Sequence, residues 1–379
     1  MTYNAVLVSS PGQMKDFLQL PFLVYRDDHS WVAPITSEVR RTLDKKRNPY
    51  FADAELELFV CYKSSVIAAR TAIVINGLHQ KKFSERSAFF GFFESINDPE
   101  AVSCLFAQAE AYCAGQGIDV LEGPFNPNHY SELGLQVSHY GTPPAFFQSY
   151  NPAYYRHLLR AVGFRPTAVF QTMKNENIRE YMQERYGSLQ GSVEVDGYKV
   201  RSLSLADLEN ELERIREVNN DAFSSNWHFL PLSREEYLFS AKFLRLVTRP
   251  ELVKIIEHQG RPVGVVHCVL DINPLLRKMN GKTGLLKALR FLYGRRKIKT
   301  LIIFSVGIKK AYQHTQAFRL LLQAFCQTVQ KYEVLETTWL SGENSTVMAS
   351  AEHLGLKPDK QFAIYKKSIS PETRKEEFR

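Results

Sequence analysis

The chain has 379 residues, of which 44% are hydrophobic and 23% charged, and this composition excludes a disordered or fibrous protein. Its five cysteines form no CxxC pair, which excludes a disulfide framework and a cysteine-rich zinc site and fits reduced thiols in a cytoplasmic protein. The net charge of +8 is uneven, because thirteen Lys and Arg residues and no acidic residue lie between Asp271 and Glu333. Such a concentration of positive charge predicts an anionic partner.

Strand and helix patterns alternate through the first half of the chain. The helix pattern after the third strand has Asn97 or Asp98 as a cap, Pro99 in its first turn and Gly115–Gly117 as its stop. The predicted elements are a hairpin over 55–76, a strand over 86–96, a helix over 97–117, a strand over 119–125 and a helix over 151–164.

The second half repeats this order, which predicts two domains of one plan, at 1–190 and 191–368, with a disordered tail at 369–379. Its hairpin turns at Gln259-Gly260. The predicted elements are a helix over 205–223, a hairpin over 251–271, a strand over 300–308, a helix over 317–332, a strand over 334–341, a helix over 343–356 and a strand over 361–367.

Several short segments carry a family resemblance. In the second half these are "VGI" at 306–308, the turn "QG" and the helix "ENS…LGL"; in the first half they are "LPFLVYRDDHSWVAP", "FFGFFESINDPEA", "LEGPFNPN" and "YNPAYYRHLLRAVGF". The chain resembles bacterial tandem GNAT (GCN5-related N-acetyltransferase) proteins, including the bacterial ceramide synthases, which N-acylate a sphingoid base. The resemblance implies an α/β fold with two mixed-sheet GNAT domains. It identifies the fold better than the reaction.

The resemblance also implies where an acyl donor binds. In a GNAT enzyme the fourth strand separates from the fifth, a backbone N–H polarises the thioester carbonyl, and the next loop holds the diphosphate of CoA. The family loop reads Arg/Gln-x-x-Gly-x-Gly/Ala; here Gln313 fits, but Gln316 and Phe318 replace the small residues. The candidate donor-binding residues are Val306, Gly307, Ile308, Lys309, Lys310, Gln313, His314 and Ala317.

The altered loop leaves two interpretations open. A degenerate domain that binds nothing is one. The other is that Lys309, Lys310 and His314, with no acid nearby in the sequence, attract a phosphate and partly replace the lost amide contacts. The phosphopantetheine arm of an acyl carrier protein carries a single phosphodiester and needs less cradle than CoA, and carrier proteins are typically acidic.

The family's thiolate-protonating tyrosine is missing, since Ala351 stands at its place in the second half and Leu159 in the first. The first half also carries the acidic "ESINDPE" at its loop position, which predicts a non-catalytic scaffold. The candidate catalytic residues of the second half are Asp271, Glu336, His267 and Tyr312. Each of these also has a structural interpretation, as a paired strand acid or a packed core ring.

Two polar segments are candidates for substrate binding. The segment "SNWHFLP" at 225–231 lies where family members place residues that line the substrate, and "GPFNPNHYSEL" follows a predicted strand end. Both also suit ordinary turns. The candidate residues are Asn226, Trp227, Asn126, Asn128, Tyr130 and Glu132.

The segment 273–299 is an insertion with leucines at helical spacing among basic residues. This pattern is typical of a helix at an anionic membrane surface, and equally of a helix packed on the core with solvated lysines. Nucleic acid is disfavoured as a partner, because the basic residues alternate with leucines and no recognition motif occurs.

Taken together, the residues and the resemblance predict a cytoplasmic N-acyltransferase, peripheral at the inner membrane face. The expected donor is a fatty acyl thioester on CoA or a carrier protein, with no metal, and the expected acceptor is an amine such as a sphingoid base. The alternative is a non-catalytic GNAT-fold module that binds acyl groups or anionic membrane.

Overall fold

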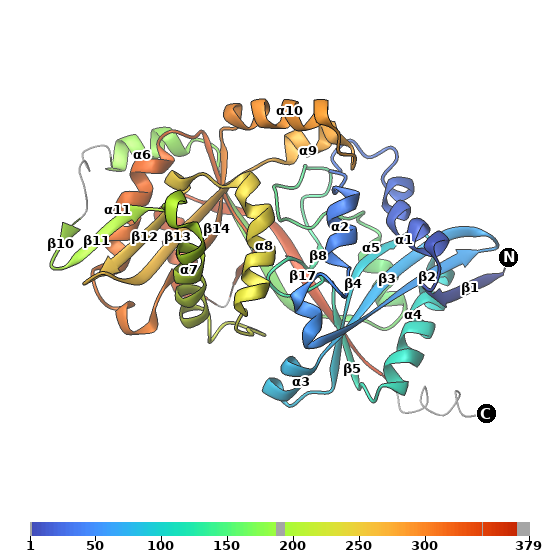
Figure 1. The fold of residues 1–379 in the computed structure, drawn as a ribbon. Helices are drawn as coiled ribbons and strands as arrows, with labels where there is room; N and C mark the ends of the chain where they lie inside the picture. The colour runs from blue at the N-terminus through green and yellow to red at the C-terminus, as the bar shows by residue number, and fades with distance from the viewer. Residues whose placement is uncertain (1, 187–193, 343, 370–379) are drawn as a thin grey trace. The chain divides into compact units, whose positions relative to one another are not determined.

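The computed structural model describes residues 2–186, 194–342 and 344–369, and the predicted tail at 370–379 lies outside them. These residues form two compact units (Figure 1). Unit 1 consists of residues 1–170, 276–283 and 360–379, and unit 2 of 171–275 and 284–359. No described helix is long and apolar enough to span a bilayer. The division into independent domains at residue 190 stays a prediction.

Unit 1 has a mixed sheet in the order β1-β2-β3-β4-β5-β17. Its first four strands are antiparallel, β5 runs parallel to β4, and β17 runs antiparallel to β5. The strands are β1 Tyr3–Leu7, β2 Ala54–Lys63, β3 Val66–Asn76, β4 Ser87–Ser95, β5 Val120–Gly123 and β17 Lys357–Ser368, of which residues 360–368 belong to this unit, with the short strands β6 Phe125–Asn126, β7 Glu132–Leu133 and β8 Leu135–Gln136. The helices of this half of the sequence are α1 Pro11–Val24, α2 Thr36–Thr42, α3 Gly77–Phe83, α4 Pro99–Gly115 and α5 Tyr155–Ala161.

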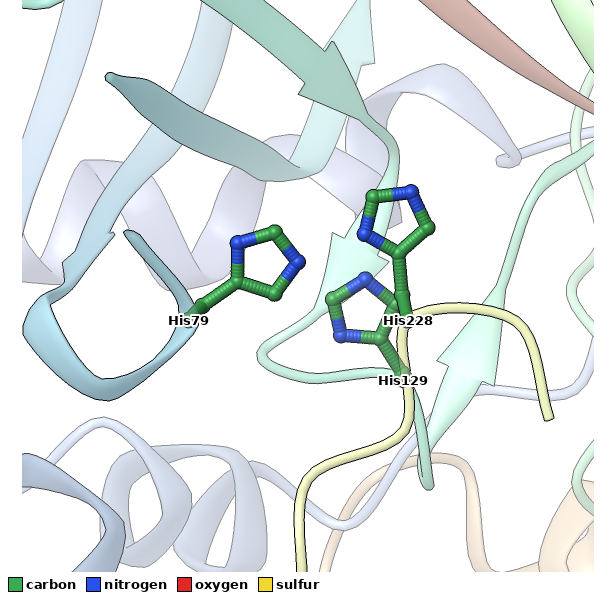
Figure 2. A group of neighbouring side chains, drawn as sticks. All are labelled: His79, His129 and His228. Carbon is green, nitrogen blue, oxygen red and sulfur yellow. The ribbon is translucent and has the colours of Figure 1, made fainter. Parts of the chain in front are cut away.

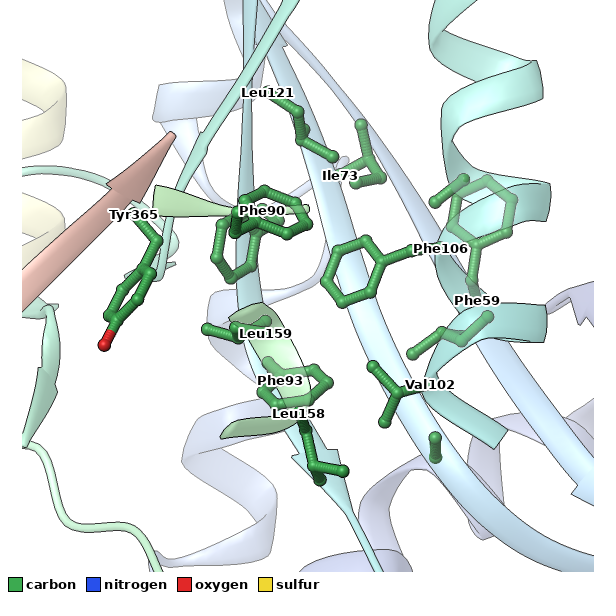
Figure 3. Close-up of a cluster of buried hydrophobic side chains, with 14 of the residues drawn as sticks. Phe59, Ile73, Phe90, Phe93, Val102, Phe106, Leu121, Leu158, Leu159 and Tyr365 are labelled. Carbon is green, nitrogen blue, oxygen red and sulfur yellow. The ribbon is translucent and has the colours of Figure 1, made fainter. Parts of the chain in front are cut away.

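The core of unit 1 lies between the sheet and α4 with α5. Phe90 and Phe93 of β4 pack against Phe106 of α4 and Leu159 of α5 (Figure 3). Tyr365 of β17 belongs to the same cluster although it lies near the end of the sequence. α4 begins where the sequence predicts, because the Asp98 side chain accepts hydrogen bonds from the N–H groups of its first turn.

Unit 2 has a sheet in the order β9-β15-β14-β13-β12-β11-β10. The strands are β9 Arg165–Asn175, of which residues 171–175 belong to this unit, β10 Glu194–Val195, β11 Tyr198–Ser202, β12 Val253–His258, β13 Arg261–Leu270, β14 Thr300–Ile308, β15 Val334–Thr337 and β16 Leu340–Ser341. The helices are α6 Ile178–Tyr186, α7 Leu208–Ala222, α8 Arg234–Val247, α9 Asn273–Met279, of which residues 273–275 belong to this unit, α10 Leu285–Gly294, α11 Ala317–Val329 and α12 Ser345–His353.

The local elements predicted from the sequence are confirmed. The hairpin β12–β13 turns at Gln259 and Gly260, both with positive φ, as the "QG" pair predicts. α7 and α8 pack on one face of this hairpin around Ile215, Val218 and Val265, and α11 also packs on β12 and β13.

The sheets are completed by strands from the opposite half of the sequence. β5 of the first half pairs with β17, Tyr365 lying opposite Gly123. β15 of the second half pairs with β9, Glu336 lying opposite Lys174. Each of the two sheets thus includes a strand from the other half of the sequence.

Candidate functional site

In unit 2, β14 loses its neighbour β15 halfway along its length. The parallel pairing runs from Thr300 opposite Val334 to Ile303 opposite Thr337 and then stops. β14 itself continues to Ile308 and stays paired with β13 on its other side. The resemblance implied such a separation at Val306–Ile308, and the sheet has it.

The backbone of Val306 is directed toward the side where β15 has departed. Lys309 donates its N–H to the carbonyl of Val263 on the β13 side, at 2.8 Å, and Gly307 lies opposite Val265. Successive residues of an antiparallel strand alternate in the direction of their N–H groups. The N–H of Val306 therefore points away from β13, and among the described residues no side chain is bonded to it.

Around this part of β14 lie three buried polar atoms that have no hydrogen-bond partner among the described residues. They are Oδ1 of Asn219, Oγ of Ser305 and Nδ1 of His267. A Cβ at Gly307 would lie 3.4 Å from Oδ1 of Asn219, so α7 covers this face of the strand. Ser305 is two residues from Gly307 and opposite His267, which puts all three side chains on one face.

His267 is the candidate catalytic residue that lies closest to this point. Its Nε2 is 2.9 Å from Oγ1 of Thr248, and its ring packs on Phe304 with centroids 5.3 Å apart. Burial lowers the pKa of His267 to about 4, because an apolar surrounding disfavours the charged form. The imidazole is thus neutral at pH 7, and its unbonded ring nitrogen can accept a hydrogen bond.

The other three candidate catalytic residues lie elsewhere in unit 2. The backbone N–H of Asp271 bonds to the carbonyl of Thr300, at the opposite end of β14, about 20 Å from Val306 at the usual rise of a strand. Glu336 is buried on β15 and forms an ion pair with Lys174 at 3.4 Å. Their catalytic roles stay predictions.

Tyr312, the remaining candidate, packs against two aromatic rings. Its ring centroid is 6.4 Å from that of Tyr198 and 5.6 Å from that of His258. These rings belong to β11 and β12, on the side of the sheet away from β15. A part in protonating the leaving thiolate likewise stays a prediction.

The loop after β14 is not free of acids, which corrects the expectation drawn from the sequence. The backbone N–H of Lys310 donates to the Asp221 carboxylate at 2.6 Å, and the Gln316 side chain donates to Asp196 at 3.1 Å. Both carboxylates come from segments about a hundred residues earlier, so the local sequence gives no sign of them. They reduce the positive potential that would attract a phosphate.

Other amides of the loop are also occupied by its own chain. The N–H groups of Tyr312 and Thr315 donate to backbone carbonyls within the loop, and that of Ala317 donates to Oγ1 of Thr315. The Gln313 side chain donates to the carbonyl of Ile308, while His314 is exposed. The loop therefore offers a diphosphate fewer amides than a glycine-rich loop would.

In unit 1 the corresponding separation of β4 from β5 is filled. Their parallel pairing ends at Phe89 opposite Glu122. A Cβ at Gly91 would lie 1.7 Å from the carbonyl oxygen of Phe125, and one at Gly123 only 2.2 Å from that of Phe90. The chain that follows β5 thus crosses directly over β4, and only glycine allows so close an approach.

Side chains bond to the amides of the separated part of β4. The N–H of Phe92 donates to Oδ1 of Asn126 at 2.6 Å, and that of Ser95 donates to the Tyr155 hydroxyl at 2.8 Å. Tyr155 in turn donates to Glu94 at 2.7 Å. These contacts occupy the positions that a thioester carbonyl would need.

Aromatic packing completes this filling. Phe89 makes edge contacts with Phe125 and His129 at 5.3 and 4.8 Å. The rings of His79 and His129 are parallel, with centroids 5.7 Å apart (Figure 2). The interpretation of the first half as a scaffold is consistent with this packing.

The candidate substrate-binding residues form turns and local contacts. Asn126 donates to Glu132 at 3.2 Å, besides its contact with Phe92. Oδ1 of Asn128 accepts from the N–H of Tyr130 at 3.1 Å. In unit 2, Asn226 and Trp227 are exposed in the segment after α7, with the Trp227 ring on that of His228. Their roles in binding stay predictions.

Three residues near the end of β14 have no recognisable signal in the sequence: Asn219, Ser305 and Asp221. Asn219 and Asp221 lie on a helix whose residues have no motif, and Ser305 belongs to a strand in which a serine is unremarkable. The only signal available was the family position of "VGI", which locates the strand end but not the side chains around it.

The fold matches solved tandem GNAT structures over nearly the whole chain. A tandem GNAT protein from the clavulanic acid biosynthesis pathway matches with a TM-score of 0.57 and 11% identity over 98% of this chain and 99% of its own. A GCN5-related N-acetyltransferase from Sphaerobacter thermophilus matches with a TM-score of 0.52 and 12% identity, covering 97% and 96%. The chain thus has the tandem GNAT fold that the sequence predicts.

Two curated proteins are similar in sequence from end to end. The bacterial ceramide synthase of Caulobacter vibrioides (strain NA1000 / CB15N) is 27% identical over 97% of both chains. Protein YghO of Escherichia coli (strain K12) is 22% identical over 94% of this chain and 93% of its own. No family model matches. The resemblance to tandem GNAT-like acyltransferases is confirmed, and these relatives support an N-acyltransferase enzyme.

Proposed function

We propose that the chain transfers a fatty acyl group from a thioester to the amine of a lipid precursor, with unit 2 as the catalytic unit and unit 1 as its scaffold. The observation that carries this proposal is the contrast between the two units. The N–H of Val306 on β14 has no bonded side chain among the described residues, whereas β4 has its amides bonded to Asn126 and Tyr155.

The reaction needs one hydrogen-bond donor for the thioester carbonyl and two hydrogen-bond acceptors for the attacking amine. The Val306 N–H would polarise the thioester carbonyl, as an oxyanion hole does. An amine would bind through Oδ1 of Asn219 and Oγ of Ser305, which are buried without partners. As the nitrogen attacks, the N–C bond forms and the C–S bond breaks, and the proton that the nitrogen loses passes through Nδ1 of His267 to the leaving thiolate, which departs as the thiol.

The donor that suits the altered loop is an acyl group on phosphopantetheine. Asp221 already accepts from the N–H of Lys310, so a diphosphate would find fewer amides than in a glycine-rich loop. A phosphopantetheine arm presents one phosphodiester, and an acidic carrier protein would be attracted by exposed basic residues such as Lys310 and Arg319. Acyl-CoA would react in the same way but would bind more weakly than the acyl carrier protein.

The similarity to a protein named bacterial ceramide synthase supports a sphingoid base as the proposed acceptor. A sphingoid base is a long-chain amine, and its head would place the nitrogen at Asn219 and Ser305. Trp227 and Asn226, exposed after α7, would contact the rest of the acceptor.

The test is a reaction of the purified full chain with sphinganine and either palmitoyl carrier protein or palmitoyl-CoA, with the amide detected by mass spectrometry. We expect amide from both donors and a higher kcat/KM with the carrier protein. A higher kcat/KM with palmitoyl-CoA would reject the carrier-protein preference. If neither donor gives an amide while purified chain retains lipid, the protein is a binding module and the catalytic proposal fails.

A further inference from the structure

α10, Leu285–Gly294 (Figure 1), carries several large apolar side chains that are exposed. The exposed fractions are 80% for Leu285, 71% for Leu286, 55% for Leu289, 50% for Leu292 and 63% for Tyr293. Their spacing, i, i+1, i+4, i+7 and i+8, places them on one side of a helix. Exposure of this many large apolar side chains on one short helix marks an interaction surface.

The opposite side of α10 fixes the helix to unit 2. Phe291 is buried, and a Cβ at Gly294 would lie 2.7 Å from Cδ2 of Leu275. The N–H of the Arg249 side chain donates to the carbonyl of Arg295 at 3.0 Å. The helix is therefore held by the protein while its leucines point outward. The packed-helix interpretation of 273–299 does not describe these leucines.

Positive charge surrounds the apolar face. Arg290, Arg296 and Lys297 are exposed, and none of them forms an ion pair with a described residue. Lys297 lies over the ring of Tyr293, with 4.8 Å between Nζ and the ring centroid. The sequence has no acid from Ile272 to Tyr332 that would neutralise them.

We propose that α10 binds an anionic lipid bilayer, with its leucines and Tyr293 at the boundary of headgroups and acyl chains and its basic residues against lipid phosphates. An amphipathic helix with leucines on one face and Lys and Arg beside them binds membranes through both contributions. Tyr293, with a polar tip on an apolar ring, suits the interfacial depth.

A second copy of the chain is a poorer occupant of this surface. A stable interface buries roughly 800 Å² on each partner, whereas a ten-residue helix is only about 15 Å long. Two copies would also oppose their basic residues, which repel in the absence of acids. The combination of apolar and cationic side chains complements an anionic membrane instead.

The test is flotation of the full-length chain with vesicles of phosphatidylcholine alone or mixed with an equal amount of phosphatidylglycerol. We expect binding to the mixed vesicles and little to phosphatidylcholine alone. The double variant Leu286→Ser with Leu289→Ser is expected to lower the partition coefficient about tenfold or more. Leu205→Ser, at another exposed leucine, is the matched control and is expected to bind as the unchanged chain does.

A variant with reversed charges measures the electrostatic contribution to vesicle binding separately from the contribution of the leucines. Arg290→Glu with Arg296→Glu is expected to lower binding to the mixed vesicles about tenfold or more, whereas Lys357→Glu, at an exposed lysine outside α10, leaves it within twofold. Circular dichroism checks that each variant is folded. Equal binding of the unchanged chain and the leucine variant would overturn the proposal, as would equal binding to both kinds of vesicle.

Two further outcomes would assign the surface to another partner and reject the membrane. One is loss of a dimer in the leucine variant, measured by analytical ultracentrifugation, with no vesicle binding by the unchanged chain. The other is loss of acyl-carrier-protein binding in the leucine variant, again with no vesicle binding by the unchanged chain. The membrane contact rests on α10 and not on the reaction, so acyl transfer to a short, soluble amine, measured in parallel, tests the proposed function separately.

Discussion

The Asp221 carboxylate accepts a hydrogen bond of 2.6 Å from the backbone N–H of Lys310. Asp221 is at the end of α7, and Lys310 is in the loop that a GNAT enzyme uses for the donor's phosphates. The contact places a negative charge where a phosphate would bind. The affinity for the donor therefore depends on the Asp221 charge as well as on the missing loop glycines.

Removing that charge should strengthen donor binding. Asp221→Asn keeps an oxygen acceptor for the Lys310 N–H and removes the negative charge, so the affinity for a phosphopantetheine thioester is expected to rise roughly threefold. Isothermal titration at low and high salt measures it, and the gain should shrink with salt. Glu217→Gln, at an exposed acid of the same helix, is the control. An unchanged affinity would mean that no phosphate approaches Lys310.

The same phosphate contact predicts the effect of reversing the loop's own charges. Lys309→Glu with Lys310→Glu is expected to lower donor affinity at least tenfold, because two attractive charges become repulsive at the phosphate. Fluorescence titration with the acyl carrier protein measures the affinity, and thermal unfolding checks the fold. Lys331→Glu, in the same basic stretch but beyond α11, serves for comparison. If the charge-reversed and unchanged chains bind the donor with equal affinity, the donor phosphate does not contact Lys309 or Lys310.

The backbone N–H of Val306 is expected to stabilise the reacting carbonyl. Val306→Pro removes that N–H without removing a bond to β13, because the N–H points to the other side of β14. Acyl transfer should fall about a hundredfold, the usual effect of losing one oxyanion donor. Val306→Ala keeps the N–H and should stay within a few-fold of the unchanged chain. Full activity of the proline variant would place catalysis elsewhere.

Tyr155 tests the scaffold role of unit 1. It is buried and bonds both the Ser95 N–H and Glu94. Burial raises the pKa of Glu94, with Arg70 and the Tyr155 hydroxyl acting against this increase. Tyr155→Phe is expected to destabilise the fold by about 1–3 kcal/mol in urea unfolding, while acyl transfer at low denaturant stays within twofold.

The comparison variant for this experiment is Tyr154→Phe. Among the described residues the Tyr154 hydroxyl donates to the carbonyl of Ser95 alone, at 2.8 Å, so its loss should lower the free energy of unfolding less. A folded Tyr155→Phe protein without acyl transfer would show that unit 1 takes part in the chemistry, and the assignment of catalysis to unit 2 would then be wrong.

The local elements were predictable from the sequence because their signals are local. Asp98 caps α4 and Gln259-Gly260 makes the tight turn of β12–β13, and each depends on neighbouring residues alone. The contact of Asp221 with the loop after β14 and that of Asn219 with β14 were not predictable, since each joins residues about ninety positions apart. The leucine spacing of α10 indicated a helix, but whether its apolar face is covered depends on tertiary packing.

Acid stability provides a test of the His267 environment. Burial lowers the pKa of His267 to about 4, below its ordinary value near 6.5. Between these values the unfolded chain binds a proton that the folded chain does not, so stability falls as pH drops, by up to about 1.4 kcal/mol per pH unit. His267→Gln should lose less stability from pH 7 to pH 5, whereas exposed His314→Gln should behave as the unchanged chain. Parallel pH profiles for all three would contradict the buried neutral imidazole.

β17 and β9 each pair with a strand from the other half of the sequence, β17 with β5 and β9 with β15. Tyr365 of β17 is buried in unit 1. Met173 of β9 is buried in unit 2, where its backbone N–H donates a hydrogen bond to Oγ1 of Thr337 at 2.9 Å. Truncating either side chain to alanine should destabilise its unit by about 2–5 kcal/mol. The two units contain separate reporters, Cys113 and Cys268, both fully buried thiols.

Burial raises the pKa of Cys113 to about 12 and also raises that of Cys268, so neither thiol reacts until its unit opens. Tyr365→Ala should therefore expose Cys113 to maleimide before Cys268, although Tyr365 lies far from Cys113 in sequence. Met173→Ala should reverse that order. Peptide mapping of the labelled protein measures both rates. If each half of the sequence closed its own sheet, Tyr365→Ala would expose Cys268 first, because β17 would then complete the sheet of the second half.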